Sequence, residues 1–276
     1  GSMTFGHYYS VVKNPFDVSF DDAVFTVFDI ETTGLSVNFD KIIEIAAVKI
    51  KDGHIVEEYQ TYVNPQRPLS MLTTKLTSIK NADVQYAPLI DTAIHEFKAF
   101  FKGTIMVAHN AHFDMGFIEN ILKKFDIYDE KITSIDTLSI ARNCYSTELK
   151  RFNLKAVSRY FKVELTQHHR AIYDTRATAD IFLHMLRDAK KQGVKNLKDF
   201  NLLSEKGQAY KHVISKSINL LVKNEKGLKN LFQIVSEANT NYFYKGARLL
   251  KRVLDKYRDG ILVGSGCMNS AFLEVA

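Results

Sequence analysis

The sequence predicts an α/β fold in which a mixed β-sheet is flanked by helices. Three apolar runs near the start, at 24–30, 41–50 and 54–63, have the β-branched and aromatic residues that favour strands. Later segments carry apolar residues at helical spacing, and one short apolar run at 104–110 indicates a further buried strand. Strands combined with helices in this order are typical of a sheet that is covered by helices.

The first three strands differ in how deeply they are expected to lie. The run from Val24 to Ile30 is apolar on both faces, as in a central strand that is covered on both sides. The run at 54–63 alternates only in part, which is typical of a more exposed strand. Asp52 and Gly53 separate it from the preceding strand and predict a hairpin turn.

Five helices are predicted between the third strand and Gly193. Pro68 and Pro88 open two of them, because proline suits the first turn of a helix. Asn153 is placed to cap another, and Gly193 ends the last one. The five ranges are 68–78, 88–101, 111–125, 153–161 and 171–193.

The composition limits the class of protein. The 276 residues are 46% hydrophobic and 25% charged, which is ordinary for a soluble globular protein. No apolar run approaches the length of about 18 residues that indicates a membrane-spanning helix. The two distant cysteines, Cys144 and Cys267, favour a reducing compartment and argue against a disulfide framework or a zinc cluster.

The charge is divided unevenly along the chain. Residues 1–149 hold 13 basic and 20 acidic side chains, a net charge of −7. Residues 150–276 hold 24 basic and 11 acidic side chains, a net charge of +13. This asymmetry indicates an anionic partner for the second half, with a well-solvated basic surface as the alternative.

The sequence changes character after Gly193, where a polar segment at 194–206 is expected to be a linker. A segment of about 70 residues follows, which is too short for more than a marginal core without metals or disulfides. This C-terminal segment is predicted to be a small partial α/β unit of two strands and two helices, at 212–222, 225–238, 246–257 and 260–266.

At the N-terminus, Gly1-Ser2-Met3 is expected to be the scar of an expression tag and not a signal peptide.

Four acidic residues stand where their elements should face the core. Asp29 and Glu31 lie two positions apart at the end of the buried first strand, so their side chains point to the same side, with Cα atoms roughly 7 Å apart. Asp114 belongs to the apolar stripe of its helix, and Asp174 has the same place on the last helix. Carboxylates from three elements are therefore expected to converge.

Such a group of acids favours a metal site. A buried, unpaired carboxylate is costly, and several together repel each other. Divalent cations with oxygen ligands, Mg²⁺ or Mn²⁺, remove this repulsion, although any one of these acids alone is more often a helix cap or half of an ion pair. A histidine before the last helix would lie at the mouth of the site, and spacing alone does not choose between His168 and His169.

Three segments resemble a known family. "VFDIETTGL" at 27–35, "VAHNAHFDMGFI" at 107–118 and "HHRAIYDTRATA" at 168–179 are similar to the three motifs of the DEDDh family of 3′→5′ exonucleases, in the same order. The resemblance covers 24–190 and implies the ribonuclease-H-like fold of that family. One branch, the proofreading exonucleases of PolC-type DNA polymerase III from low-GC Gram-positive bacteria, also resembles "IIEIAAVKI", "NPQRPLS", "IDTL", "ELTQHHRAIYDT" and "GLKNLFQIVSEANTNYFYKGARLL".

The resemblance implies which residues act. The catalytic residues would be Asp29, Glu31, Asp114, His169 and Asp174. The four acids would bind two divalent cations, Mg²⁺ or Mn²⁺, with Asp29 shared between them, and His169 would be the general base. Residues that would contact the terminal nucleotide are Thr32, Thr33, Leu35, His109, Asn110 and Phe113.

The resemblance also implies a substrate and a setting. The substrate would be a single-stranded or frayed 3′ end of DNA, and the products would be nucleoside 5′-monophosphates. The partners would be the remaining polymerase chain and the replisome, in the bacterial cytoplasm and without a membrane.

The resemblance implies a division of the chain as well. In that polymerase the exonuclease is inserted into a PHP (polymerase and histidinol phosphatase) domain, and "DKYRDGILVGSGCMNS" resembles the segment that follows the insertion. The expected divisions are a leader at 1–22 with the tag scar and a PHP piece, the exonuclease at 23–193, the linker at 194–206 and a partial PHP segment at 207–276.

Two positions depart from the family patterns. Arg176 stands where relatives often carry an acidic or small residue, and Ala271 replaces a glutamate of PHP domains, whose His-x-His pair is also absent. Arg176 changes the local charge expected near the third exonuclease motif, whereas the missing glutamate and histidine pair argue against metal chemistry in the PHP segment. The alternatives are an RNA-trimming member of the DEDDh family and a catalytically degenerate module that only binds DNA or partner subunits.

Overall fold

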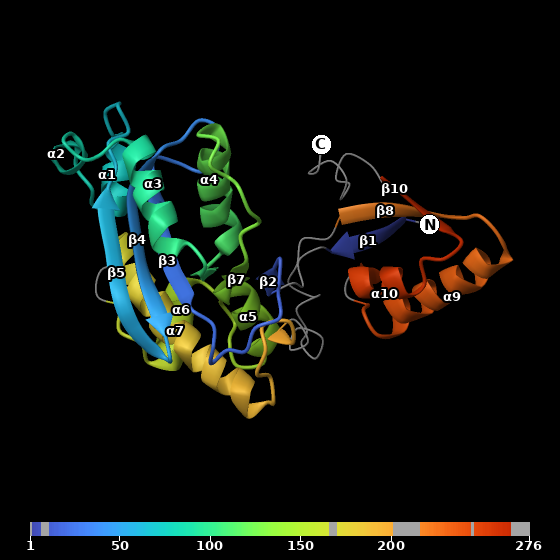
Figure 1. Ribbon diagram of the computed structural model, residues 1–276. Helices are drawn as coiled ribbons and strands as arrows, with labels where there is room; N and C mark the ends of the chain where they lie inside the picture. Colours follow the sequence, from blue (N-terminus) through green and yellow to red (C-terminus); the bar gives the residue numbers. More distant parts are fainter. Residues whose placement is uncertain (1, 7–10, 166–169, 201–215, 244–245, 266–276) are drawn as a thin grey trace. The chain divides into compact units, whose positions relative to one another are not determined.

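The computed structural model of the chain describes residues 2–6, 11–165, 170–200, 216–243 and 246–265. The chain divides into two compact units (Figure 1). The larger unit comprises Val11–Glu205, and the smaller one comprises Gly1–Ser10 together with Lys206–Ala276. The first and last segments of the sequence thus belong to one unit, and the segment between them forms the other.

A six-stranded mixed sheet forms the middle of the larger unit (Figure 1). Its strands are β2 (Val12–Lys13), β3 (Phe25–Thr32), β4 (Ile42–Lys51), β5 (His54–Tyr62), β6 (Ile105–Ala108) and β7 (Ser134–Asp136). Their order across the sheet is β2-β7-β6-β3-β4-β5. β4 pairs antiparallel with both β3 and β5, whereas β6 pairs parallel with both β3 and β7. The predicted α/β fold with a mixed sheet is confirmed.

Helices cover both faces of this sheet (Figure 1). The described helices of the unit are α1 (Met71–Thr77), α2 (Asn81–Val84), α3 (Ile90–Phe101), α4 (Ala111–Lys124), α5 (Thr137–Cys144), α6 (Leu154–Phe161) and α7 (Ala171–Lys191). Along β3, Val27 packs into one core cluster with α5, α6 and α7, whereas its neighbour Phe28 packs into another with α3 and α4. β3 is therefore the buried central strand that its sequence predicts. No helix in the described part of the chain has the length and apolar character needed to cross a membrane.

One predicted helix starts later than expected. The helix expected at 68–78 begins at Met71, because Ser70 caps it by accepting a hydrogen bond from the Thr73 N–H over 3.0 Å. The other four predicted helices correspond to α3, α4, α6 and α7, with ends within two residues of those expected. Four short elements of this unit were not predicted, because two to eight residues are too few to show a clear period: β2, β7, α2 and α5.

Two segments expected to lie outside the exonuclease domain contribute to the core of the larger unit. The expected linker at 194–206 places Val194, Leu197 and Phe200 in the core cluster that includes α7. The expected leader at 1–22 contributes β2, and Phe20 packs edge-on against Phe200 with ring centroids 5.2 Å apart. Val194, Leu197 and Phe200 are separated by polar residues, which is why the sequence pattern predicted a linker there.

The smaller unit contains a four-stranded sheet in the order β10-β8-β1-β9. Its elements are β1 (Ser2–Gly6), β8 (Lys216–Val222), α9 (Glu225–Thr240), β9 (Arg248–Leu250), α10 (Lys251–Lys256) and β10 (Ile261–Ser265). Ser2 and Met3, expected to be a tag scar outside the fold, belong to β1, which pairs with β8 and β9. The basic helix expected at 246–257 is instead a short strand followed by α10.

Candidate active site

Three carboxylates meet at the C-terminal end of β3. One oxygen each from Asp29, Glu31 and Asp174 lies within 4.8 Å of the other two. The two β3 acids stand at alternate positions after Val27, on the face of the sheet against which α7 packs, and Asp174 lies in the first turn of α7. The structure thus brings together three of the four acids that the sequence predicts as metal ligands.

Small side chains let α7 approach this end of the sheet. Ala46 of β4 lies opposite Asp29 in the ladder and is fully buried. The Thr175 hydroxyl donates a hydrogen bond to the Ala46 carbonyl over 3.2 Å, and Ala46 packs with Ala171. The first turn of α7 is therefore close enough to the sheet for Asp174 to reach the two acids of β3.

Asp114 lies beside the cluster, in the first turn of α4. Its Oδ1 accepts a hydrogen bond from the backbone N–H of Ile30 over 3.3 Å, so it is held against the residue between Asp29 and Glu31. Its side chain is buried. Because α4 and α7 cover opposite faces of the sheet, the acids approach the end of β3 from both sides.

These acids have strongly raised pKa values. Burial, followed by the charges of Asp114 and Glu31, raises the pKa of Asp29 well above its ordinary value. Burial raises the pKa of Glu31 to about 8, with repulsion from Asp174 as the next cause. Burial also raises the pKa of Asp114 to about 8. A cation would offset this cost, and carboxylate oxygens are ligands that Mg²⁺ and Mn²⁺ prefer, so the donor set fits a divalent cation.

Sequence reasoning missed another acid, Glu44. It lies opposite Glu31 in the β3–β4 ladder, is fully buried, and forms an ion pair with Arg170, whose Nη2 is 3.3 Å from Glu44 Oε1. A charged residue inside the apolar run "IIEIAAVKI" was the available signal, because buried charges are almost always paired.

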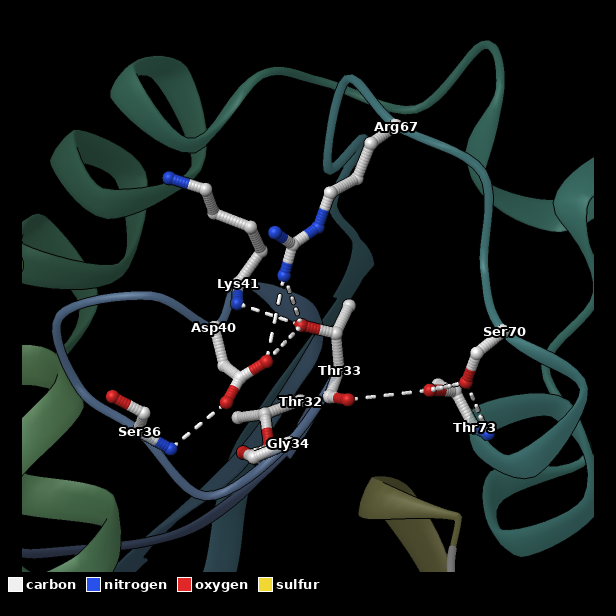
Figure 2. Close-up of polar contacts among 9 residues, drawn as sticks. All are labelled: Thr32, Thr33, Gly34, Ser36, Asp40, Lys41, Arg67, Ser70 and Thr73. Carbon is white, nitrogen blue, oxygen red and sulfur yellow. Dashed lines mark hydrogen bonds and ion pairs between the residues drawn. The ribbon is translucent and has the colours of Figure 1, made fainter.

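Thr32 and Thr33, predicted to contact the substrate, use their hydroxyls within the loop that follows β3 (Figure 2). The Thr32 hydroxyl donates to a backbone carbonyl two residues later over 2.6 Å. The Thr33 hydroxyl donates to Asp40 Oδ1 over 3.0 Å and accepts from the Lys41 N–H and the Arg67 guanidinium. Both hydroxyls are therefore occupied by partners that hold the loop in shape.

Leu35, Asn110 and Phe113, also predicted to contact the substrate, do come together. They line a groove of about 530 Å³ between the loop after β3 and α4, together with His112 and Lys123. Leu35 is 84% exposed, so its side chain is accessible to a ligand. Its lining includes Phe113, which directly precedes Asp114 in the first turn of α4.

His109, also predicted to contact the substrate, uses both ring nitrogens for contacts within the protein. Its Nε2 donates a hydrogen bond to the Phe152 carbonyl over 2.9 Å, and its Nδ1 lies 2.9 Å from the Thr137 hydroxyl. Burial lowers the pKa of this imidazole. His109 therefore ties the end of β6 to α5 and to the segment before α6, and it does not line the groove.

The predicted general base, His169, and its neighbour His168 lie outside the described residues. Arg170 follows them directly in the sequence and is the N-cap residue of α7. The role of His169 therefore stays a prediction.

A family model described as exonuclease matches residues 26–182, which is more than half of the chain. The chain belongs to this exonuclease family. All five predicted catalytic residues fall within the matched range. A second model, described as PHP domain, matches residues 162–275. The resemblance to an exonuclease with a PHP segment is therefore confirmed.

Curated relatives of this exonuclease are bacterial DNA polymerases. The chain is 44% identical over 257 residues to the PolC-type DNA polymerase III of Staphylococcus saprophyticus, covering 93% of the chain and 18% of the relative. It is 44% identical over 244 residues to that of Caldanaerobacter subterraneus, covering 88% of the chain and 17% of the relative. The exonuclease domain is thus homologous to part of these polymerases, and the chain spans less than a fifth of their length.

Solved exonuclease structures share the fold. Exonuclease X in complex with 5′ overhanging duplex DNA has a TM-score of 0.50 and 25% identity, and the match covers 65% of this chain and 99% of that one. E. coli Exonuclease I in complex with a dA16 oligonucleotide has a TM-score of 0.55 and 18% identity, and the match covers 63% of this chain and 42% of that one. The mixed sheet with helices on both faces is therefore an arrangement found in nucleases.

Proposed function

We propose that the larger unit is a metal-dependent 3′→5′ exonuclease that removes nucleotides from the 3′ end of DNA. The observation that carries this proposal is the convergence of Asp29, Glu31 and Asp174, with one oxygen of each within 4.8 Å of the others. Clustered carboxylates repel each other unless positive charge lies between them. Phosphodiester hydrolysis needs positive charge at the same place, because the attacking and leaving oxygens both carry negative charge.

The four acids would hold two divalent cations, Mg²⁺ or Mn²⁺. Asp29, Glu31 and Asp174 suit the first, and Asp29 with Asp114, which approaches from the other face of the sheet, suits the second. When bound, the two cations supply positive charge that stabilises both oxygens of an in-line displacement.

Other residues of the chain would move the proton and place the substrate. His169 would accept the proton of the attacking water, a contribution of typically about 10²–10⁴-fold in rate. The water oxygen bonds to phosphorus while the bond between phosphorus and the 3′-oxygen breaks, and the 3′-oxygen takes up a proton. The products are a nucleoside 5′-monophosphate and a shortened strand. The groove lined by Leu35, Asn110 and Phe113, the residue before Asp114, would hold the terminal nucleotide.

DNA is the proposed substrate because the relatives are named DNA polymerases and the similar Exonuclease X structure contains duplex DNA. In a polymerase, removing the last nucleotide would correct a mispaired primer end, so single-stranded or frayed ends are the expected form. The rest of a PolC-type polymerase chain and the replisome would be the partners, in the bacterial cytoplasm. Residues 207–276 would be part of a PHP domain without chemistry of their own, since Ala271 replaces the family's acid.

Digestion of a single-stranded DNA oligonucleotide labelled at its 5′ end tests the proposal. With Mg²⁺ or Mn²⁺ we expect a ladder of labelled fragments that shorten one nucleotide at a time. With EDTA we expect no digestion. Early release of the 5′ label as a mononucleotide, or digestion that survives EDTA, would contradict the proposal.

An RNA oligonucleotide of the same sequence separates the alternatives in the same assay. Much faster digestion of RNA than of DNA would favour an RNA-trimming enzyme. Binding of DNA in a gel-shift experiment without digestion of either strand would favour a degenerate binding module.

A further inference from the structure

Glu44 and Arg170 form an ion pair beside the acid cluster, and the chemistry proposed above uses neither of them. Glu44 is fully buried and lies opposite Glu31 in the β3–β4 ladder. Residues that oppose each other in an antiparallel ladder share a face of the sheet, so both carboxylates leave β3 and β4 on the same side. A buried charge at this position would be costly without partners.

Each carboxylate oxygen of Glu44 accepts two hydrogen bonds. Oε1 accepts from Gln60 Nε2 over 2.8 Å and from Arg170 Nη2 over 3.3 Å. Oε2 accepts from Arg170 Nε over 3.4 Å and from the Ala171 N–H over 3.3 Å. Arg170 in turn donates to the Tyr62 hydroxyl over 2.6 Å. The buried carboxylate is thus satisfied by donors from β5 and from the start of α7.

The bond from Ala171 makes Glu44 the cap of helix α7. Ala171 is the first residue of this helix, and the N-cap residue Arg170 makes no capping hydrogen bond with its own side chain. The first N–H groups of a helix have no partner within the helix and need an acceptor from elsewhere. Glu44 supplies one from β4, and its negative charge is favourable at the positive end of the helix.

This contact fixes the part of α7 that carries a proposed metal ligand. Asp174 follows Ala171 by three residues and so lies in the same first turn. A rotation or shift of that turn would move Asp174 away from Asp29 and Glu31. Arg170 also offsets the charge of Glu44, so that the pair adds little net negative charge next to Glu31.

We propose that the Glu44–Arg170 pair is a positioning device that anchors the first turn of α7 to β4, so that Asp174 completes the metal site. Both residues act through Asp174 and contact neither substrate nor cation. The effect on turnover rests on the proposed exonuclease function, whereas the effect on cation binding does not.

Calorimetric titration of the full chain with Mn²⁺ tests the inference without an activity assay. Arg170→Ala should lower the affinity for Mn²⁺ about tenfold or more, the loss typical for residues that orient metal ligands, with an unchanged circular dichroism spectrum. Arg170→Lys should restore part of the affinity, because lysine keeps the charge and loses the forked donors. Arg176→Ala is the matched control, since Arg176 lies on the same helix and pairs with Glu58 at the surface over 2.7 Å. It should bind Mn²⁺ like the unchanged chain.

Turnover of a single-stranded DNA oligonucleotide is the second readout. Arg170→Ala should lower kcat about tenfold or more and leave KM for DNA little changed, because a displaced Asp174 affects the chemical step and not the groove. Glu44→Gln is the second variant, for the case in which Arg170→Ala does not fold. It keeps the size of the side chain and loses one acceptor oxygen. It should lower Mn²⁺ affinity as well.

Unchanged Mn²⁺ affinity in Arg170→Ala and Glu44→Gln would overturn the inference, as would an equal loss in Arg176→Ala. If the unchanged chain digests no DNA but these differences in Mn²⁺ affinity are found, the proposed function is wrong and the positioning role stands.

Discussion

Asp29 occupies a strand position that would hold an apolar residue if the strand were only structural. Val27 and Phe28 before it are core residues, and burial raises the pKa of Asp29 well above its ordinary value. Groups with such strongly perturbed pKa values are concentrated at functional sites, because the chemistry requires these residues although they destabilise the fold. The same reasoning applies to Glu31 and Asp114, and it leads to predictions for single residues.

Replacing Asp114 with asparagine separates repulsion from cation binding. Without metal at pH 8, we expect Asp114→Asn to be at least as stable as the unchanged chain, because it removes a buried charge. With Mn²⁺ at one hundred times its Kd, the unchanged chain should gain about 2.7 kcal/mol, and the variant should lose most of this gain. Thermal melts with and without Mn²⁺ measure both effects. Asp126→Asn is a suitable control, because Asp126 is exposed and its φ of 57° is one that asparagine tolerates. Equal Mn²⁺-induced shifts in all three proteins would count against the metal site.

The raised pKa values predict how stability depends on pH without metal. The pKa of Glu31 and that of Asp114 are both about 8 in the folded protein, whereas an unfolded chain has values of about 4. Between these values the folded state binds more protons than the unfolded state, so the free energy of unfolding should fall as pH rises towards and through 8. Melts in EDTA between pH 5 and pH 9 test this. Asp114→Asn should show a shallower fall, and identical slopes in both proteins would refute the assignment.

His169 is predicted to be the general base. His169→Ala should lower kcat by about 10²-fold or more and leave Mn²⁺ affinity largely intact, because the imidazole would move a proton and not hold the cation. His168→Ala is the matched control and should have much less effect on kcat. The reverse ranking of the two variants would show that the neighbouring histidine is the base.

At the scale of elements, the loop after β3 is held by Asp40 (Figure 2). Its two oxygens accept from the Thr33 hydroxyl and from the Ser36 N–H, and Oδ1 also lies 3.4 Å from the Arg67 guanidinium. This arrangement requires glycine at position 34, where a Cβ would lie 2.5 Å from Asp40 Oδ2. The loop leads to Leu35, so its shape decides one wall of the groove.

Gly34→Ala should therefore lower the free energy of unfolding by about 1–3 kcal/mol, the usual cost of an extra methyl group in a packed site. Gly116→Ala is the control on α4, where the nearest atom to an added Cβ is Val37 Cγ2 at an ordinary 3.6 Å. It should be neutral or stabilising, because alanine favours a helix over glycine by about 1 kcal/mol. Urea titrations of both variants measure the difference, and an equal loss in both would show that Asp40 does not restrict position 34.

The longer elements could be predicted from the sequence, and the shorter ones could not. β3, β4, α4 and α7 carry enough apolar residues to show a period, and four acids could be placed on β3, α4 and α7. β2 and β7, with two and three residues, form only because neighbouring strands pair with them. Glu44 was overlooked for a related reason, since its partner Arg170 is distant in sequence and only the fold brings the two together.

At the scale of the whole molecule, the larger unit extends beyond Gly193. Val194, Leu197 and Phe200 are buried in its core. A chain of residues 11–193 should therefore be less stable than one of residues 11–205 by about 3 kcal/mol or more, since each buried apolar side chain of this size contributes about 1.5–3 kcal/mol. Thermal melts of the two shortened chains measure this. Equal melting temperatures would mean that these three residues contribute little to the core.

The uneven charge also belongs to the whole molecule. The net charge of +13 over residues 150–276 suits an anionic partner, and binding through phosphate contacts weakens as salt rises. We expect the affinity of the full chain for single-stranded DNA to fall steeply between about 50 and 200 mM salt. Fluorescence anisotropy with a labelled oligonucleotide in EDTA, where no digestion is expected, measures this, and an affinity independent of salt would contradict a role for the basic half in DNA binding.

The central claim is that the carboxylates at the end of β3 hold the cations needed for DNA hydrolysis. The turnover of Asp29→Ala tests this claim most directly. The rate of nucleoside 5′-monophosphate release from a saturating oligonucleotide in Mg²⁺ should fall by more than about a hundredfold, beyond the loss typical for a residue that only orients a metal ligand. The circular dichroism spectrum should stay that of a folded protein. Turnover close to that of the unchanged chain would show that the acid cluster is not the site of the chemistry.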